Sequence, residues 1–123
     1  MTMTTLDQTA LKYIQSWNER DAVRRRASID DLFAESCTYT DPMAAVRGRD
    51  GVDGFIAAVQ KQFAGVSFGL AGAVDAHHGV ARFTWHATVP GVADPVAIGF
   101  DVMVVEAGKI TQIVGFLDKA PAA

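Results

Sequence analysis

The chain has 123 residues, 50% of them apolar, and a formal net charge of −3 at pH 7. This length and composition favour one globular domain, predicted over residues 1–123, and exclude a disordered chain. The acidic balance argues against a nucleic-acid partner, and no apolar run reaches the roughly 20 residues of a membrane-spanning helix. Cys37 is the one cysteine, and the N-terminal residues lack a signal-peptide pattern, so we expect a cytoplasmic protein.

The first predicted helix starts near the N-terminus and runs to residues 18–21. Thr5 followed by Gln8 matches a capping box, with Thr5 as the N-cap. The apolar residues at helical spacing are Leu6, Ala10, Leu11, Ile14 and Trp17. Tyr13 lies three residues after Ala10 and four before Trp17. Its side chain is therefore predicted on the same apolar face.

A second helix is predicted from Ala22 or Ser28 to Glu35. The basic run at 24–26 is interpreted as a solvated helix or linker face, because aspartates flank it on both sides. A third helix is predicted to begin with Asp50 as its cap and to stop near Gly65, after a loop over residues 43–49.

Asp41 ends a short predicted strand over residues 37–41 and is followed by Pro42. Proline cannot donate to a sheet, and it pushes the preceding residue into an extended conformation. Asp41 is therefore a carboxylate held where a strand turns. The residues alone leave two interpretations open, a turn former and the base of an apolar pocket.

From Val66 onward the spacing of apolar residues changes from helical to alternating. We predict four sequential antiparallel strands, one beginning at Val66 and the others over residues 80–89, 96–106 and 109–117. Helices followed by such strands predict an α+β domain, with three N-terminal helices on one face of a strongly bent antiparallel sheet that encloses a pocket.

The strand over residues 96–105 is apolar on both faces. We therefore expect a second subunit to cover its outer face, which gives a homodimer. Asp101 shares a face of this strand with Gly99 and Met103, and a buried carboxylate is costly unless it is paired or protonated. Asp101 either lies at an exposed edge or pairs with Arg82, or it is a carboxyl group of raised pKa in a dry pocket.

This order of elements resembles the nuclear transport factor 2-like (SnoaL-like) superfamily, whose members form a cystatin-like cone. Within it, three positions resemble ketosteroid isomerase. Tyr13 stands in a YIQSWN segment, Asp41 precedes Pro42, and Asp101 lies eight residues before Lys109. The resemblance implies that Asp41 is a general base and that Tyr13 and a protonated Asp101 donate hydrogen bonds to an enolate oxygen.

The function implied by the resemblance is that of a cofactor-independent isomerase of the steroid delta-isomerase type, acting on a small hydrophobic ketone without a metal. The alternatives are a SnoaL-like polyketide cyclase or dehydratase, a hydrolase that activates water, and a non-catalytic protein that binds small molecules. The candidate substrate-binding residues are Trp17, Phe33, Met43, Phe55, Trp85 and Leu117. The expected partners are a small hydrophobic ligand and a second copy of the chain.

The three histidines bear on the dehydratase alternative. In a strand, His77 and His78 would point to opposite faces, so we do not expect them to chelate one metal ion. His86 alternates with Trp85 and is expected to face away from it. A histidine that reached the pocket could act with Asp41 as an acid–base pair.

Overall fold

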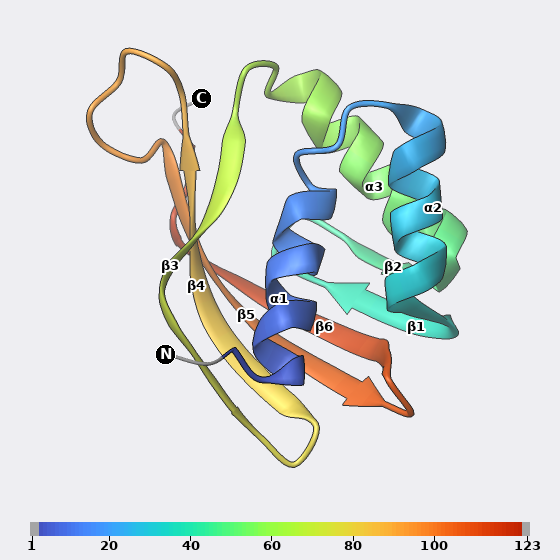
Figure 1. The fold of residues 1–123 in the computed structure, drawn as a ribbon. Coiled ribbons are helices and arrows are strands. Elements are labelled where there is room, and N and C mark those ends of the chain that lie inside the picture. Colours follow the sequence, from blue (N-terminus) through green and yellow to red (C-terminus); the bar gives the residue numbers. More distant parts are fainter. Residues whose placement is uncertain (1–2, 122–123) are drawn as a thin grey trace.

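The structure, a computed structural model that describes residues 3–121, contains three helices and six strands in that range. In chain order they are α1 (Thr5–Ser16), α2 (Ala22–Leu32), β1 (Phe33–Thr40), β2 (Ala45–Arg47), α3 (Gly48–Gln62), β3 (Ser67–His77), β4 (Val80–Thr88), β5 (Ala97–Glu106) and β6 (Lys109–Lys119). Figure 1 shows the helices on one side of a strongly curved sheet. The predicted α+β architecture is confirmed. Within residues 3–121, none of the helices is long and apolar enough to span a membrane.

The six strands form one sheet in the order β2-β1-β6-β5-β4-β3. Strands β3 to β6 pair antiparallel with their chain neighbours, as predicted. The sheet is nevertheless mixed, because β1 pairs parallel with β6. The bent antiparallel sheet that was predicted thus contains one parallel pair, which the long crossover connection between β1 and β6 makes possible. The predicted loop over residues 43–49 also contains the short strand β2, which pairs with β1.

The helix boundaries differ from the prediction where other contacts compete. Thr4, not Thr5, caps α1: its Oγ1 accepts from the amide of Asp7 at 3.0 Å, and the Asp7 carboxylate accepts from the Thr4 amide at 2.9 Å. Helix α2 ends at Leu32 rather than at residue 35, because Phe33 already pairs with β6. Helix α3 begins before Asp50, whose carboxylate is not its cap.

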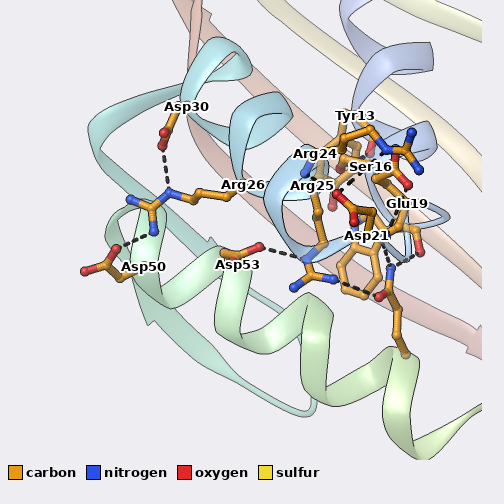
Figure 2. A network of polar contacts seen from close by, with 12 residues as sticks. Tyr13, Ser16, Glu19, Asp21, Arg24, Arg25, Arg26, Asp30, Asp50 and Asp53 are labelled. Atoms are coloured by element: carbon orange, nitrogen blue, oxygen red, sulfur yellow. Dashed lines mark hydrogen bonds and ion pairs between the residues drawn. The ribbon is translucent and has the colours of Figure 1, made fainter.

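A buried arginine ties the helices together, contrary to the interpretation of residues 24–26 as a solvated run. Arg25 is only 6% exposed, and its guanidinium donates to Asp53 at 2.8 Å and to Gln60 at 3.0 Å. Gln60 in turn donates to the carbonyls of Trp17 and Glu19 at the end of α1. Figure 2 shows this network between α2 and α3. It holds the end of α1, and with it Trp17, in place over the sheet.

Candidate active site

Tyr13 of α1 and Asp101 of β5 meet inside the fold, although they are 88 residues apart. The Tyr13 hydroxyl donates to Asp101 Oδ2 at 3.2 Å. The Tyr13 ring is fixed by edge contacts with Phe33 and Phe83, each with ring centroids 6.0 Å away. Asp101 is only 4% exposed and does not pair with Arg82, which binds Asp75 at 3.0 Å. The buried interpretation of Asp101 therefore describes its position.

Asp101 has a second donor that sequence reasoning missed. The indole Nε1 of Trp85 donates to Asp101 Oδ1 at 3.3 Å. Trp85 lies directly opposite Gly99 in the β4–β5 register, and a Cβ on Gly99 would come within 2.0 Å of the indole ring. The glycine thus leaves space for the indole on the inner face, two residues along the strand from Asp101. A glycine opposite a tryptophan was the sequence signal for this contact.

Asp41 is fixed by three hydrogen bonds. Its Oδ1 accepts from the amides of Met43 at 2.7 Å and Ala44 at 2.9 Å. Its Oδ2 accepts from the hydroxyl of Tyr39 at 2.6 Å. Asp41 therefore forms the turn and also faces the cavity described below, so the two sequence interpretations are compatible. Tyr39 was missed as a site residue, although it stands two positions before Asp41, on the same side of the chain.

Gly115 of β6 separates the two carboxyl groups. It pairs with Asp101 in the sheet, and its neighbour Val114 pairs with Thr40, the residue before Asp41. A Cβ on Gly115 would lie 2.8 Å from Asp101 Oδ1 and 3.3 Å from the Cβ of Asp41. Both acids therefore reach the space that a side chain at this position would fill.

The electrostatics of the site follow from burial and from this proximity. Desolvation raises the pKa of Asp101 to about 6, and the negative charge of Asp41 adds to the rise, while the bonds from Trp85 and Tyr13 oppose it. Burial, together with the nearby Asp101 charge, raises the pKa of Tyr13 well above its usual value and also raises the pKa of Tyr39. Both phenols therefore stay protonated at neutral pH and act as donors.

Tyr13, Asp41 and Asp101 all line one cavity with a volume of about 70 Å³. Of the predicted substrate-binding residues, those that line it are Trp17, Met43, Phe55, Trp85 and Leu117. Phe33 does not line the cavity; it is fully buried in the core behind Tyr13. Apart from the two acids, the two tyrosines and the N–H groups of the two indoles, the lining is apolar. Such a site can move a proton and stabilise an anionic oxygen in a dry environment.

Residues at the end of α3, before β5 and in the C-terminal segment line both the cavity and the space beside it. An open groove there shares four lining residues with the cavity. They are Phe63, Val66, Val96 and Pro121. A ligand that enters from the groove must pass these apolar side chains.

No histidine is among the described residues that line the cavity. His86 pairs with Ile98 on the outer face, as expected. His77 and His78 do not point to opposite faces, however: their Nδ1 atoms are 3.4 Å apart. The strand expectation fails because His78 lies in the hairpin turn with a φ of 50°. Within residues 3–121, no group of three histidine, cysteine or acidic side chains is arranged to hold a metal ion.

The comparisons with known proteins identify the family. The model of the SnoaL-like domain matches residues 10–113, a range that includes Tyr13, Asp41 and Asp101. The chain belongs to the SnoaL-like family. A candidate isomerase of this family from Agrobacterium tumefaciens is 38% identical, with a TM-score of 0.89, over 94% of this chain and 99% of that one. No curated protein matches the chain.

More distant solved structures share the SnoaL-like fold. A candidate ketosteroid isomerase from Kribbella flavida is 19% identical with a TM-score of 0.70, over 97% of this chain and 82% of that one. A candidate SnoaL-like polyketide cyclase from a Jannaschia species is 16% identical with a TM-score of 0.76, over 94% and 87% of the two chains. At these identities the likeness supports the fold alone.

Proposed function

We propose that the protein is a cofactor-independent isomerase that enolises a small hydrophobic ketone. The observation that carries this proposal is that Tyr13, Asp41 and Asp101 line one apolar cavity. A carboxylate base and two oxyanion donors are the groups that such a reaction needs. The likeness to a candidate isomerase at 38% identity supports the same reaction class.

In the proposed reaction, Asp41 is the base. Its carboxylate takes a proton from the carbon beside the ketone, the C–H electrons form the C=C bond of an enolate, and the carbonyl π electrons move to oxygen. Asp41 then returns the proton to a different carbon, which completes the isomerisation. A positioned base contributes about 10²–10⁴-fold to the rate. Tyr39, bonded to Asp41 Oδ2, orients the carboxylate.

Tyr13 and Asp101 are proposed to hold the enolate oxygen. Removing one donor of such a pair costs about 10²–10³-fold in rate. Asp101 can donate only when it is protonated, and with a pKa of about 6 it holds its proton more strongly than a solvent-exposed aspartate. A bound ketone excludes water, and the developing enolate is an anion, so both favour the protonated form of Asp101 in the complex.

The cavity volume supports a small substrate. Pockets for drug-sized ligands have volumes of roughly 300–1,000 Å³, whereas this one has about 70 Å³. Its apolar lining favours a hydrocarbon skeleton around one carbonyl group. A monocyclic β,γ-unsaturated ketone satisfies both conditions.

The test measures isomerisation of cyclohex-3-enone to its conjugated isomer by ultraviolet absorbance, with a 5-ene-3-oxosteroid as the larger comparison. We expect turnover by the wild type and a loss of about 10²–10⁴-fold in Asp41→Asn. Equal rates for the two proteins would remove Asp41 as the base. Asp75→Asn is the matched control, because Asp75 lies exposed at the other end of the sheet, paired with Arg82.

A second candidate is a non-catalytic protein that binds a small ligand. The three hydrogen bonds that Asp41 already accepts favour it, since they are also what a purely structural turn requires. This candidate predicts that small ketones bind, as seen by quenching of tryptophan fluorescence, while their α-protons do not exchange with D₂O. Exchange catalysed by the wild type but not by Asp41→Asn decides for the isomerase.

We also propose that the outer face of the sheet forms a homodimer interface. The cross-strand pairs Phe100–Phe116 and Val102–Val114 lie on this face, and Phe116 is 53% exposed. An apolar patch of this kind is typical of an interface. Analytical ultracentrifugation of the wild type and Phe116→Glu tests it: the wild type is expected to sediment as a dimer and the variant as a monomer.

A further inference from the structure

We propose that Trp85 is a positioning residue that determines which oxygen of Asp101 carries the carboxyl proton. The inference rests on the proposed function, because it concerns the same oxyanion site. The indole N–H occupies Asp101 Oδ1, so the proton resides on Oδ2, beside the Tyr13 hydroxyl. With that arrangement, Asp101 and Tyr13 can both donate to one oxygen of a ligand.

The two hydrogen-bond partners of Asp101 differ in their donor properties. An indole N–H can only donate, whereas a phenol hydroxyl can donate or accept. Trp85 therefore requires an acceptor at Oδ1 in every protonation state, at a distance of 3.3 Å. A proton on Oδ1 would compete with that bond. Tyr13, 3.2 Å from Oδ2, can rotate its hydroxyl when Oδ2 becomes protonated.

The position of the indole is fixed from two sides. Across the strand pair, Gly99 leaves the space that the ring fills: a Cβ there would lie 2.0 Å from the six-membered ring and 2.6 Å from Nε1. On the other side, Phe68 of β3 packs against Trp85 with ring centroids 5.5 Å apart and an interplanar angle of 69°. The N–H direction is therefore set by the fold and does not require a ligand.

The surroundings of Asp101 explain why one hydrogen bond has a measurable effect. The titratable groups that face it are Tyr13 from α1, Tyr39 from β1 and Asp41 just after β1, while β6 contributes only Gly115. Asp41 disfavours ionisation of Asp101, and Trp85 favours it by donating to the carboxylate. Removing the indole N–H leaves the Asp41 repulsion in place. The proton of Asp101 should then persist to higher pH.

The experiment follows Asp101 by ¹³C NMR of the labelled carboxyl carbon, identified by its disappearance in Asp101→Asn. We expect Trp85→Phe, which keeps an aromatic ring but removes the N–H, to tighten proton binding by Asp101 about tenfold. Phe63→Leu is the matched control, since it changes another aromatic residue of the cavity lining, keeps the N–H and leaves Gly99 and Phe68 in place, and it should leave the titration midpoint unchanged. An unchanged midpoint in folded Trp85→Phe would overturn the proposal.

A second measurement uses the wild type and so does not depend on whether the variant folds. The Trp85 indole ¹H–¹⁵N resonance is expected to titrate with the same midpoint as the Asp101 carboxyl carbon and to lose that response in Asp101→Asn. An indole resonance that ignores the Asp101 titration contradicts the proposal. Gly99→Ala approaches the same bond from the other strand: its Cβ displaces the indole, and it should raise the Asp101 midpoint as Trp85→Phe does.

These readouts separate the positioning role from the enzyme assignment. If the wild type isomerises no ketone but Trp85→Phe still shifts the Asp101 midpoint, the proposed function fails and the positioning role stands. If turnover occurs and the midpoint does not move, the positioning role alone fails. With both intact, the pH range over which the enzyme turns over should extend upward by about one unit in Trp85→Phe.

Discussion

Asp101 and Gly115 face each other across the β5–β6 pair, and a Cβ at position 115 would lie 2.8 Å from Asp101 Oδ1. The same Cβ would lie 3.3 Å from the Cβ of Asp41. The two acids thus depend on one residue that has no side chain. In a sheet otherwise rich in β-branched residues, position 115 therefore lacks a side chain at the point where Asp101 and Asp41 approach each other.

Gly115→Ala should therefore damage the site more than its small size suggests. The added methyl group must displace Asp101, Asp41 or both, and overpacking of this kind costs about 1–3 kcal/mol of stability. We expect isomerase activity to fall at least tenfold, because both the base and an oxyanion donor shift. Steady-state kinetics and urea denaturation check this. Gly108→Ala, at a turn where a Cβ meets no neighbouring atom, should lower stability through its φ of 78° and leave the rate of the folded enzyme unchanged.

The stability of the fold should depend on pH through Asp101. Its pKa in the folded protein is about 6, above the ordinary value of 3.8, so the folded state binds this proton more tightly than the unfolded state. The resulting stabilisation is fully present below pH 3.8 and is lost as pH rises through about 6. It amounts to at most about 3 kcal/mol.

Asp101→Asn should abolish this dependence. Urea denaturation at several pH values between 4 and 7.5 measures it: the free energy of unfolding of the variant should fall less over this range than that of the wild type. Asp75→Asn removes a carboxylate that is 62% exposed and should follow the wild type. If the free energy of unfolding changes by the same amount over this pH range in the wild type and in Asp101→Asn, the assignment of a raised pKa to Asp101 is contradicted.

Arg25 should matter for stability, and its neighbour Arg24 should not. Removing one partner of a buried ion pair leaves the other charge uncompensated, which costs about 3 kcal/mol or more. The Arg25 side chain is 7% exposed and bonded to Asp53, whereas that of Arg24 is 75% exposed. Thermal denaturation of Arg25→Gln and Arg24→Gln compares the two, with a clear loss expected only in the first. Equal melting temperatures would mean that the network in Figure 2 carries little free energy.

Access to the cavity should depend on Val96, which is shared by the cavity and the outer groove. Val96→Trp should narrow the mouth and raise the KM for cyclohex-3-enone at least tenfold, with little effect on the Asp101 titration. Val92→Trp is the control, because Val92 lines the groove but not the cavity. If the two variants have the same KM as the wild type, the ligand enters by another route.

Local periodicity is enough to predict much of this site. Helical spacing puts Tyr13 and Trp17 on the inner face of α1, and strand alternation puts Asp101 and Trp85 on the inner face of the sheet, where both lie. Neither pattern predicts where the polar atoms of these side chains point or which groups they bond. For that reason the indole N–H of Trp85 and the hydroxyl of Tyr39 were missed as partners of the two acids.

Long-range pairing and unusual backbone angles account for the other differences. Phe33 leaves the predicted second helix because it pairs with a strand more than 70 residues later, and nothing in its neighbours signals this. His77 and His78 meet because His78 adopts a positive φ, which is rare for a residue other than glycine and is set by the hairpin turn. Both outcomes depend on contacts that a periodicity argument does not contain.

The parallel pairing of β1 with β6 has a consequence for how the molecule folds. Strand β6 inserts between β1 and β5, so Asp41 and Asp101 become neighbours only after the last strand has docked. Sheets that depend on such non-local contacts fold slowly, because the chain loses the entropy of loop closure before strand pairing can stabilise it. During synthesis on the ribosome, Asp41 emerges well before β6, the strand that brings it next to Asp101. The cavity therefore cannot exist in the nascent chain until β6 has left the exit tunnel.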